Sequence, residues 1–309
     1  MRFEGILPPV ITPFAADGAL DRAAYATVIE QMLDKGVHGI IVGGTTGEFY
    51  ALSREERVAQ IDHARDVIAG RVPLICGVND ISTEGACAYA VAAREAGADA
   101  LLVAAPYYSL PTQNELAEHC EAIDEAGGLP IILYNYPGRT GVPMDAAFLR
   151  RLSARPNVQC IKESSGDINR IHMLVREFPD IQLSCGAEDQ ALEFFAWGAT
   201  SWVTPMGNFF PAEIVAFYDA CMRDQDFAKA RRLMTALLAL GTVLEAGGQL
   251  IQCTKLACET LGLPGGPVRR PLGPLDPEAA DSLRAVVLEA KAAIAAILSE
   301  DAPRQAQSA

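Results

Sequence analysis

Three kinds of feature are missing from this sequence: a surplus of positive charge, long apolar runs and a signal-peptide core in its first residues. The 309 residues include 25 Lys and Arg against 39 Asp and Glu, which gives a net charge of -14. Nucleic-acid surfaces neutralise phosphates with clustered Lys and Arg, so this balance argues against such a surface. No apolar run approaches the length of a membrane span, and the first six residues lack the apolar core of a signal peptide. We therefore expect a cytoplasmic protein with no nucleic-acid partner and no membrane partner.

Closely spaced cysteine pairs are missing as well. None of the eight cysteines forms the CxxC pair on which structural zinc sites depend. Most of them stand among apolar residues, where a free thiol packs as a small hydrophobic group. We therefore predict reduced, mostly buried thiols. The cysteines are Cys76, Cys87, Cys120, Cys160, Cys185, Cys221, Cys253 and Cys258.

One strand–loop–helix unit recurs along most of the chain. Short apolar strands that alternate with amphipathic helices imply a parallel sheet. Eight such units fit into about 220 residues, close to the roughly 250 of a typical closed barrel, so the predicted fold is an α/β (β/α)8 TIM barrel. The predicted strands are 6–12, 39–42, 72–78, 100–104, 130–134, 158–162, 181–184 and 200–204. The predicted helices are 21–35, 53–69, 83–96, 112–126, 144–152, 167–177, 188–197 and 211–222.

The sequence divides into three parts. Residues 1–224 hold the eight units and form the predicted catalytic barrel. Residues 225–298 are rich in Ala and Leu with a helical period, interrupted at 262–267, and predict a C-terminal helical extension. Residues 299–309 are polar and are predicted to be a disordered tail.

A lysine ends the sixth predicted strand. The apolar residues Val158, Cys160 and Ile161 mark this strand as an inner one, and Lys162 follows them directly. Burial would lower the pKa of such a lysine toward neutrality, and the neutral amine can attack a ketone to form a Schiff base. Alternatively, Lys162 is the exposed first residue of a loop, or a buried ion-pair partner. The remaining lysines all fall in predicted helices: Lys35, Lys229, Lys255 and Lys291.

Other polar groups follow the ends of neighbouring predicted strands, where catalytic groups of such barrels lie. The turn Gly43-Gly-Thr-Thr-Gly47 offers N–H groups and hydroxyls that can bind a carboxylate. Tyr134 ends the fifth strand and can carry a proton, while Arg139 can bind a second carboxylate with its paired donors. Tyr107 and Tyr108 follow the fourth strand. These groups would face one mouth of the barrel.

Each of these groups also has an ordinary interpretation when it is taken alone. Tyr134 could be a core aromatic, Arg139 a solvated loop charge, and the Tyr107-Tyr108 pair simple packing. The glycine turn could be a tight turn or a weak nucleotide signal, but a GxGxxG motif ending at Gly47 would need glycine where the chain has Val42. Their joint placement at strand ends favours an active site.

Four motifs at these strand ends resemble those of the dihydrodipicolinate synthase / N-acetylneuraminate lyase family of pyruvate-dependent class I aldolases. The motifs are Gly44-Thr-Thr-Gly-Glu48, Pro106-Tyr-Tyr108, Tyr134-Asn-Tyr-Pro-Gly-Arg-Thr-Gly141 and Ile161-Lys-Glu-Ser-Ser-Gly166. The match covers nearly the whole chain, from residue 5 to about residue 274. The resemblance implies a lyase that uses neither a metal nor an organic cofactor and that is usually a homotetramer.

The resemblance also implies a role for each matching residue. Lys162 would form the Schiff base with pyruvate, or with a 2-keto acid that is cleaved to pyruvate. Tyr134 would donate and accept protons at the reacting carbon. Thr46 would relay protons between Tyr134 and Tyr108, and Tyr108 would come from a neighbouring subunit.

Substrate-binding roles follow in the same way. Thr45 and Thr46 would hold the carboxylate of pyruvate, and Arg139 would hold the distal carboxylate of a second substrate. Gly186 and Val203 align with residues whose backbone lines the site.

The second substrate is less sharply indicated. The Thr-Thr pair, Tyr108 and Arg139 favour a condensation of pyruvate with an aldehyde, as in the dihydrodipicolinate synthases. Phe49-Tyr50, the segment 245–255 and Gly207-Asn-Phe-Phe-Pro211 depart from that pattern, and the last looks closer to keto-deoxy sugar acid aldolases. The alternatives are a 2-keto-3-deoxy sugar acid aldolase or dehydratase, and an N-acetylneuraminate lyase-like cleavage that releases pyruvate.

Two other classes of protein remain as alternatives. A metal-dependent barrel enzyme needs His, Asp and Glu at strand ends, whereas the four histidines fall in predicted helices or before the second strand. A catalytically silent binding protein would have lost Lys162 or Tyr134, and both are present. The histidines are His38, His63, His119 and His172.

Overall fold

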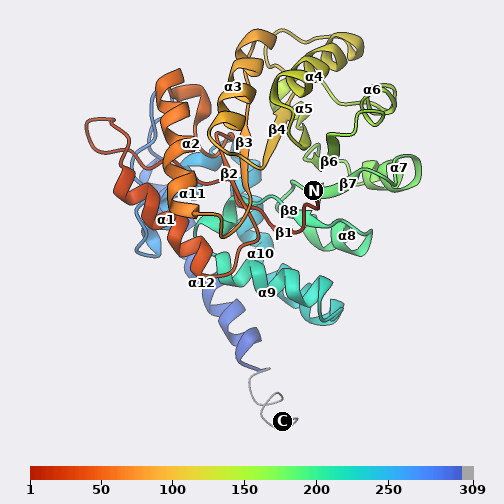
Figure 1. Cartoon of the computed structure of the whole chain (residues 1–309). Coiled ribbons are helices and arrows are strands. Elements are labelled where there is room, and N and C mark those ends of the chain that lie inside the picture. Colours follow the sequence, from red (N-terminus) through yellow and green to blue (C-terminus); the bar gives the residue numbers. More distant parts are fainter. Residues whose placement is uncertain (301–309) are drawn as a thin grey trace.

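Eight short parallel strands form the centre of the molecule, and helices surround them (Figure 1). The computed structural model describes residues 1–300. Hydrogen bonds join the strands in the order β1-β8-β7-β6-β5-β4-β3-β2. The strands are β1 (Gly5–Ile6), β2 (Ile40–Val42), β3 (Leu74–Gly77), β4 (Ala100–Ala104), β5 (Ile131–Asn135), β6 (Val158–Glu163), β7 (Gln182–Cys185) and β8 (Ser201–Trp202).

The sheet closes where its first and last members in that order, β1 and β2, meet. The predicted first strand of residues 6–12 is regular only over Gly5–Ile6, because Pro8 and Pro9 have no N–H to donate. Pro9 still forms a parallel bridge with Ile41, and the Val10 N–H donates to the Ile41 carbonyl at 2.9 Å. The (β/α)8 barrel prediction is therefore confirmed.

A helix follows each strand and packs on the outside of the barrel (Figure 1). Side-chain caps fix several of their starts, and a capping box of Ser53 and Glu56 begins α2. The barrel helices are α1 (Arg22–Asp34), α2 (Arg54–Ile68), α3 (Thr83–Glu95), α4 (Gln113–Gly127), α6 (Ala146–Leu152), α7 (Asn169–Glu177), α8 (Ala191–Ala196) and α9 (Pro211–Met222). Three short helical turns lie in the loops after strands: η1 (Phe49–Ala51), α5 (Pro137–Thr140) and η2 (Pro205–Asn208).

Three further helices follow the barrel: α10 (Phe227–Ala246), α11 (Leu250–Thr260) and α12 (Pro277–Ser299). Leu237 of α10 and Val287 of α12 belong to the same buried apolar cluster as Phe217 of α9, so one core runs through the barrel and the extension. The predicted tail begins at the end of α12, and its residues 301–309 lie outside the described part of the chain. Within residues 1–300, no helix is both long and apolar enough to cross a membrane.

A second apolar cluster fills the inside of the barrel. Its members alternate along the strands with residues that face the helices, as Ile41, Ile75 and Leu102 do. Tyr134 and Cys160 belong to this inner set. The barrel is therefore a packed core, and its usable space lies at the strand ends.

Candidate active site

Lys162 lies near the carboxyl end of β6, directly opposite Tyr134 on β5 and Ser184 on β7. Only 7% of the residue is exposed, and its Nζ lies 3.9 Å from the centroid of the Tyr134 ring. Within residues 1–300, no carboxylate lies at ion-pair distance from this amine. Burial lowers the pKa of Lys162 to about 8. Lys162 is thus neither an exposed loop residue nor half of an ion pair.

Tyr134 covers the amine from the neighbouring strand. Its side chain is buried, and this burial raises the pKa of Tyr134, so the phenol is neutral. A hydrogen bond with the Thr45 side chain acts in the opposite direction on that pKa. A neutral hydroxyl beside a buried amine can carry protons during Schiff-base chemistry.

Both threonines of the turn line the inner cavity together with Tyr134 and Lys162. Thr46 is buried, and the Thr45 side chain is the one that acts on the Tyr134 hydroxyl. The relay through Thr46 stays a prediction, and Thr45 is a second candidate for that role.

The turn that carries both threonines is fixed by close backbone contacts. Gly43 has a φ of +66°, and a Cβ built there would lie 2.9 Å from the carbonyl oxygen of Gly77. Glu48 at the other end of the turn also has a left-handed backbone, with a φ of 56°. The turn is thereby bent over the mouth of the barrel, where Thr45 and Thr46 face the cavity.

Two adjoining cavities meet at a wall formed by Thr45, Tyr134 and Tyr136. The inner cavity contains Lys162, and the outer cavity, of about 270 Å³, contains Arg139. The Lys162 amine and the Arg139 guanidinium thus lie in neighbouring cavities that share this wall.

Gly186 and Val203 line the inner cavity, as the resemblance implies. A Cβ built at Gly186 would lie 2.7 Å from Cε of Lys162 and 1.9 Å from Oγ of Ser164. Any larger residue would push the lysine side chain from its place. Gly186 thus fixes the position of the amine.

Arg139 belongs to the short helix α5, which starts at Pro137 and ends at Gly141 in a left-handed conformation. This helix turns the chain back over the barrel mouth. The Arg139 guanidinium lies 5.5 Å from the centroid of the Tyr136 ring, on the solvent side of the outer cavity. An anionic group of a substrate can reach it there.

Tyr108 is not brought to the site by its own chain. The residue is 95% exposed, with a φ of 75°, and neither cavity includes it. Tyr107 lines the outer cavity instead, where its ring lies 6.1 Å from that of Phe49. Leu110, two residues further along this loop, is also exposed, and its backbone is also left-handed, with a φ of 51°. The loop thus projects a tyrosine away from the molecule.

Two acidic residues at the inner cavity, Glu188 and Glu245, were not predicted from the sequence. Glu188 comes three residues after β7 and is only 2% exposed. Glu245 comes from α10 and is exposed at the rim, where its Oε1 accepts the Glu188 N–H at 3.4 Å. The strand-end rule that selected Lys162 could have found Glu188, but no sequence signal points to Glu245.

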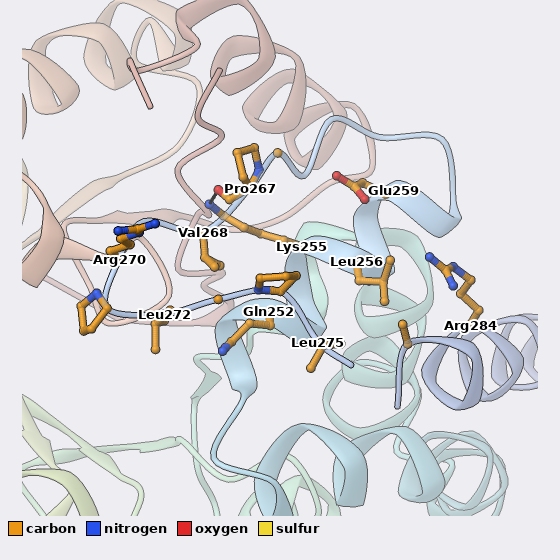
Figure 2. A pocket seen from close by; sticks show the side chains of 15 residues that line it. Gln252, Lys255, Leu256, Glu259, Pro267, Val268, Arg270, Leu272, Leu275 and Arg284 are labelled. Carbon is orange, nitrogen blue, oxygen red and sulfur yellow. Dashed lines mark hydrogen bonds between the residues drawn. The ribbon is translucent and has the colours of Figure 1, made fainter. Parts of the chain in front are cut away.

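A buried ion pair ties the threonine turn to the C-terminal extension. Oε1 of Glu48 lies 2.5 Å from Nζ of Lys255 on α11, and both side chains are buried. The Lys255 amine also donates to the Pro267 carbonyl at 2.7 Å (Figure 2). The separate cavity of about 740 Å³ drawn in Figure 2 lies beside this lysine and shares no lining residue with the two cavities at the strand ends.

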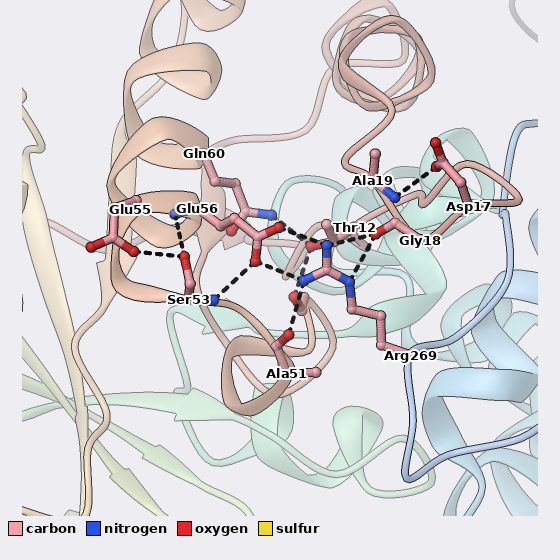
Figure 3. Close-up of polar contacts among 11 residues, drawn as sticks. Thr12, Asp17, Gly18, Ala19, Ala51, Ser53, Glu55, Glu56, Gln60 and Arg269 are labelled. Carbon is pink, nitrogen blue, oxygen red and sulfur yellow. Dashed lines mark hydrogen bonds and ion pairs between the residues drawn. The ribbon is translucent and has the colours of Figure 1, made fainter.

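Arg269 lies in the segment between α11 and α12 and makes further contacts between the extension and the threonine turn. Its N–H donates to Oε2 of Glu48 at 2.9 Å. Its guanidinium donates to both oxygens of Glu56 and to the carbonyls of Gly18 and Ala51 (Figure 3). The turn after β2 is therefore fastened to the N-terminal loop, to α2 and to the extension together.

Comparisons with known proteins show the family of this chain. The model of the dihydrodipicolinate synthetase family matches residues 2–290. A 4-hydroxy-tetrahydrodipicolinate synthase of Methanoculleus marisnigri is 38% identical over 290 residues, which cover 93% of this chain and 99% of the relative.

Solved structures give the same result. The crystal structure of dihydrodipicolinate synthase from Aquifex aeolicus is similar with a TM-score of 0.89 and 33% identity, over 93% of this chain and 98% of that one. YagE of Escherichia coli K12, a prophage protein of the same family in complex with pyruvate, has a TM-score of 0.89 and 30% identity, over 94% and 99%. The chain therefore belongs to the dihydrodipicolinate synthetase family and is a pyruvate-dependent enzyme of the class I aldolase type.

Proposed function

We propose that Lys162 forms a Schiff base with pyruvate and that the resulting enamine condenses with an aldehyde that carries a carboxylate. The observation that supports this most is the buried amine of Lys162, which has no ion-pair partner in the described chain and lies against the Tyr134 ring. The neutral amine adds to the keto carbon of pyruvate, and water leaves as the imine forms. Loss of a methyl proton then gives the enamine, whose terminal carbon attacks the aldehyde.

The surrounding groups suit this sequence of steps. The turn with Thr45 and Thr46 offers donors for the pyruvate carboxylate, and the Tyr134 hydroxyl lies where it can move protons near the imine. Arg139 in the outer cavity offers paired donors for the carboxylate of the aldehyde. The similarity to 4-hydroxy-tetrahydrodipicolinate synthases supports the synthase direction. The eight unpaired thiols of the described chain fit the proposed cytoplasmic location.

The reverse direction is the second candidate. Glu188 places an additional acid group beside Lys162, which favours substrates that carry oxygen beyond the keto group, as 2-keto-3-deoxy sugar acids do. A panel of aldehydes with pyruvate, and of 2-keto acids alone, assayed for pyruvate consumed or released, separates condensation from cleavage. Borohydride trapping with pyruvate, done first, tests the shared Schiff-base step. An absence of any trapped adduct would refute both candidates.

Imine formation with pyruvate is expected to become faster as the pH rises toward about 8 and then to level off. Burial lowers the pKa of Lys162 to about 8, although Glu188, Tyr136 and Glu245 act against that shift. The protonated amine has no lone pair to attack with, so each pH unit below that value should slow trapping about tenfold. Trapped adduct can be quantified by mass spectrometry from about pH 6 to about pH 10. A midpoint near the ordinary lysine pKa of about 10.4 would contradict the burial argument.

Arg139→Lys is expected to impair use of the carboxylate-bearing aldehyde while pyruvate trapping continues. Lysine offers a point charge instead of paired donors, and a charge-assisted hydrogen bond contributes about 1.5–3 kcal/mol. The kcat/KM for the aldehyde should therefore fall by roughly 10- to 150-fold. If Arg139 only braces its loop, the variant should instead lose thermal stability and pyruvate trapping together, or change nothing.

The exposed position of Tyr108 supports a homotetramer in which this residue reaches the site of a neighbouring subunit. A mixture of Lys162→Ala and Tyr108→Phe subunits, unfolded and refolded together, should then recover part of the activity that each variant lacks alone. In such a mixture, the intact Lys162 of one subunit meets the intact Tyr108 of its neighbour. Light scattering on the same samples gives the assembly state. A fully active monomer, or a mixture no more active than its parts, would rule this arrangement out.

A further inference from the structure

Five carboxyl side chains are buried in the described part of the chain, and four of them have a cationic partner. Glu188 is the exception: it is 2% exposed, and no Lys, Arg or His nitrogen of residues 1–300 lies at ion-pair distance from it. A buried carboxylate without a cation is costly, so the protonated acid is the favoured form. The four paired carboxyls are Glu48 with Lys255, Asp124 with Arg155, Glu163 with Arg170 and Glu213 with Lys291.

The contrast is sharpest beside the lysine itself. Glu163 follows Lys162 directly in β6, and its carboxylate accepts from Nε of Arg170 at 2.7 Å and from the amide of Asn135. These partners occupy the Glu163 carboxylate, so its role is to stabilise the fold. Glu188 faces the inner cavity with Lys162 and has no such set of donors.

One hydroxyl fixes the orientation of Glu188. Oγ1 of Thr204 lies 2.5 Å from Oε2 of Glu188 and accepts the N–H of Met206 at 3.1 Å. Thr204 is completely buried, so this contact holds one carboxyl oxygen in place. The Glu188 carboxyl group therefore has a fixed orientation, as a catalytic group requires, whereas an acid at the surface is mobile.

Burial favours the protonated state of Glu188. It is the main cause that raises the pKa of Glu188, to about 8, and the Glu245 carboxyl at the rim acts in the same direction, while the hydrogen bond with Thr204 and the charge of Lys162 act against it. Because Glu245 is exposed, it gives the buried acid a polar neighbour in contact with solvent. Glu188 can thus hold a proton at neutral pH and regain it after use.

Tyr134 and Glu188 approach Lys162 from opposite sides. Tyr134 belongs to β5 and Glu188 to the segment after β7, and β6 with Lys162 lies between these strands. The Tyr134 hydroxyl is engaged with Thr45, at the wall of the outer cavity. Because one acid lies on each side of the imine, each can transfer a proton to a different atom of the bound chain.

We propose that Glu188 is the proton donor to the oxygen on the fourth carbon of the chain bound to Lys162, while Tyr134 serves the third carbon. This assignment rests on the proposed Schiff-base function. It names the substrate class as 2-keto acids with oxygen at the fourth carbon, whether these are made or consumed.

The proton balance is simple in each direction. In condensation, the enamine carbon bonds to the aldehyde carbon, the carbonyl electron pair moves to oxygen, and that oxygen takes the Glu188 proton. Glu188 regains a proton from water, and in cleavage the same proton returns from the hydroxyl. In dehydration, the bond between the fourth carbon and its oxygen breaks, and the oxygen takes the Glu188 proton and leaves as water.

Glu188→Gln tests the assignment because it keeps the shape and the contact with Thr204 but holds no acidic proton. Two half-reactions are measured: exchange of pyruvate methyl protons with deuterated water by NMR, and turnover of pyruvate with aspartate semialdehyde or glyceraldehyde. Exchange should stay within about threefold of wild type, while turnover should fall about 100-fold or more. Asp189→Asn removes the exposed carboxylate next in the sequence and should leave both measurements unchanged. Thr204→Val should show the same split with a smaller loss of turnover.

The outcomes separate this inference from the proposed function. If wild type neither traps nor exchanges pyruvate, the Schiff-base function itself fails. If Glu188→Gln keeps full turnover, if it loses exchange and turnover equally, or if wild type exchanges pyruvate but uses neither aldehyde, the Schiff base stands and the role of Glu188 is overturned. An infrared carboxylic-acid band at neutral pH that disappears in Glu188→Gln provides a check that does not depend on a second substrate; its absence from wild type also overturns the role.

Discussion

Replacing Lys162 by alanine is expected to abolish borohydride trapping of pyruvate and to lower kcat by about four orders of magnitude or more. Without the amine no Schiff base can form. The imine nitrogen is then missing as the electron acceptor when a methyl proton of pyruvate is removed. Peptide mass spectrometry after reduction should find the added mass only on the peptide that contains Lys162.

Lys35→Ala is the matched control, because Lys35 is exposed at the end of α1. It should trap pyruvate as fast as the wild type. An adduct on another lysine, or one that persists in Lys162→Ala, would contradict the assignment of the nucleophile. The melting temperature of Lys162→Ala should not fall, since a buried amine without an ion pair does not stabilise the fold.

Glu48→Gln is expected to lower the free energy of unfolding by about 3–5 kcal/mol. The substitution leaves Lys255 buried without its anion, and burial already lowers the pKa of Lys255 against the effect of Glu48. Chemical denaturation monitored by circular dichroism gives the size of the loss. Pyruvate trapping should weaken as well, because Glu48 ends the turn that carries Thr45 and Thr46.

A double variant separates charge from shape in this prediction. Glu48→Gln combined with Lys255→Met removes both charges and should recover a large part of the lost stability. The surface pair of Glu30 and Arg71 is the control, since both side chains are nearly half exposed. Glu30→Gln should cost less than about 1 kcal/mol. A loss at Glu48 no larger than the loss at Glu30 would show that the buried pair does not stabilise the fold.

The barrel and the position of Lys162 at its mouth could be predicted because both depend on local patterns. Eight apolar strands with helices between them leave few other arrangements, and strand ends of a parallel barrel meet at one mouth. This rule was sufficient to bring Lys162 and Tyr134 together from 28 residues apart. It also brought Arg139 and the threonine turn to the same mouth.

The parts that escaped prediction depend on side-chain direction and on distant chain segments. No spacing decides which of Thr45 and Thr46 turns toward Tyr134, because the bend of the turn sets that. Glu245 lies in a helix after the barrel, and only the packing of α10 brings it near Lys162. Lys255 seemed excluded by its helix, yet it is even more buried than Lys162. Lys255 has an ion-pair partner, whereas Lys162 has none within residues 1–300. No local sequence pattern indicates this difference.

The tie between Glu48 and the extension links positions as far as 221 residues apart in the chain. A chain made from its N-terminus exposes the whole barrel sequence before Lys255 and Arg269 exist. The turn with the two threonines therefore stays unfastened while every strand is already available for pairing. The turn can therefore be fastened only after the chain has been made as far as Arg269, when all eight strands already exist.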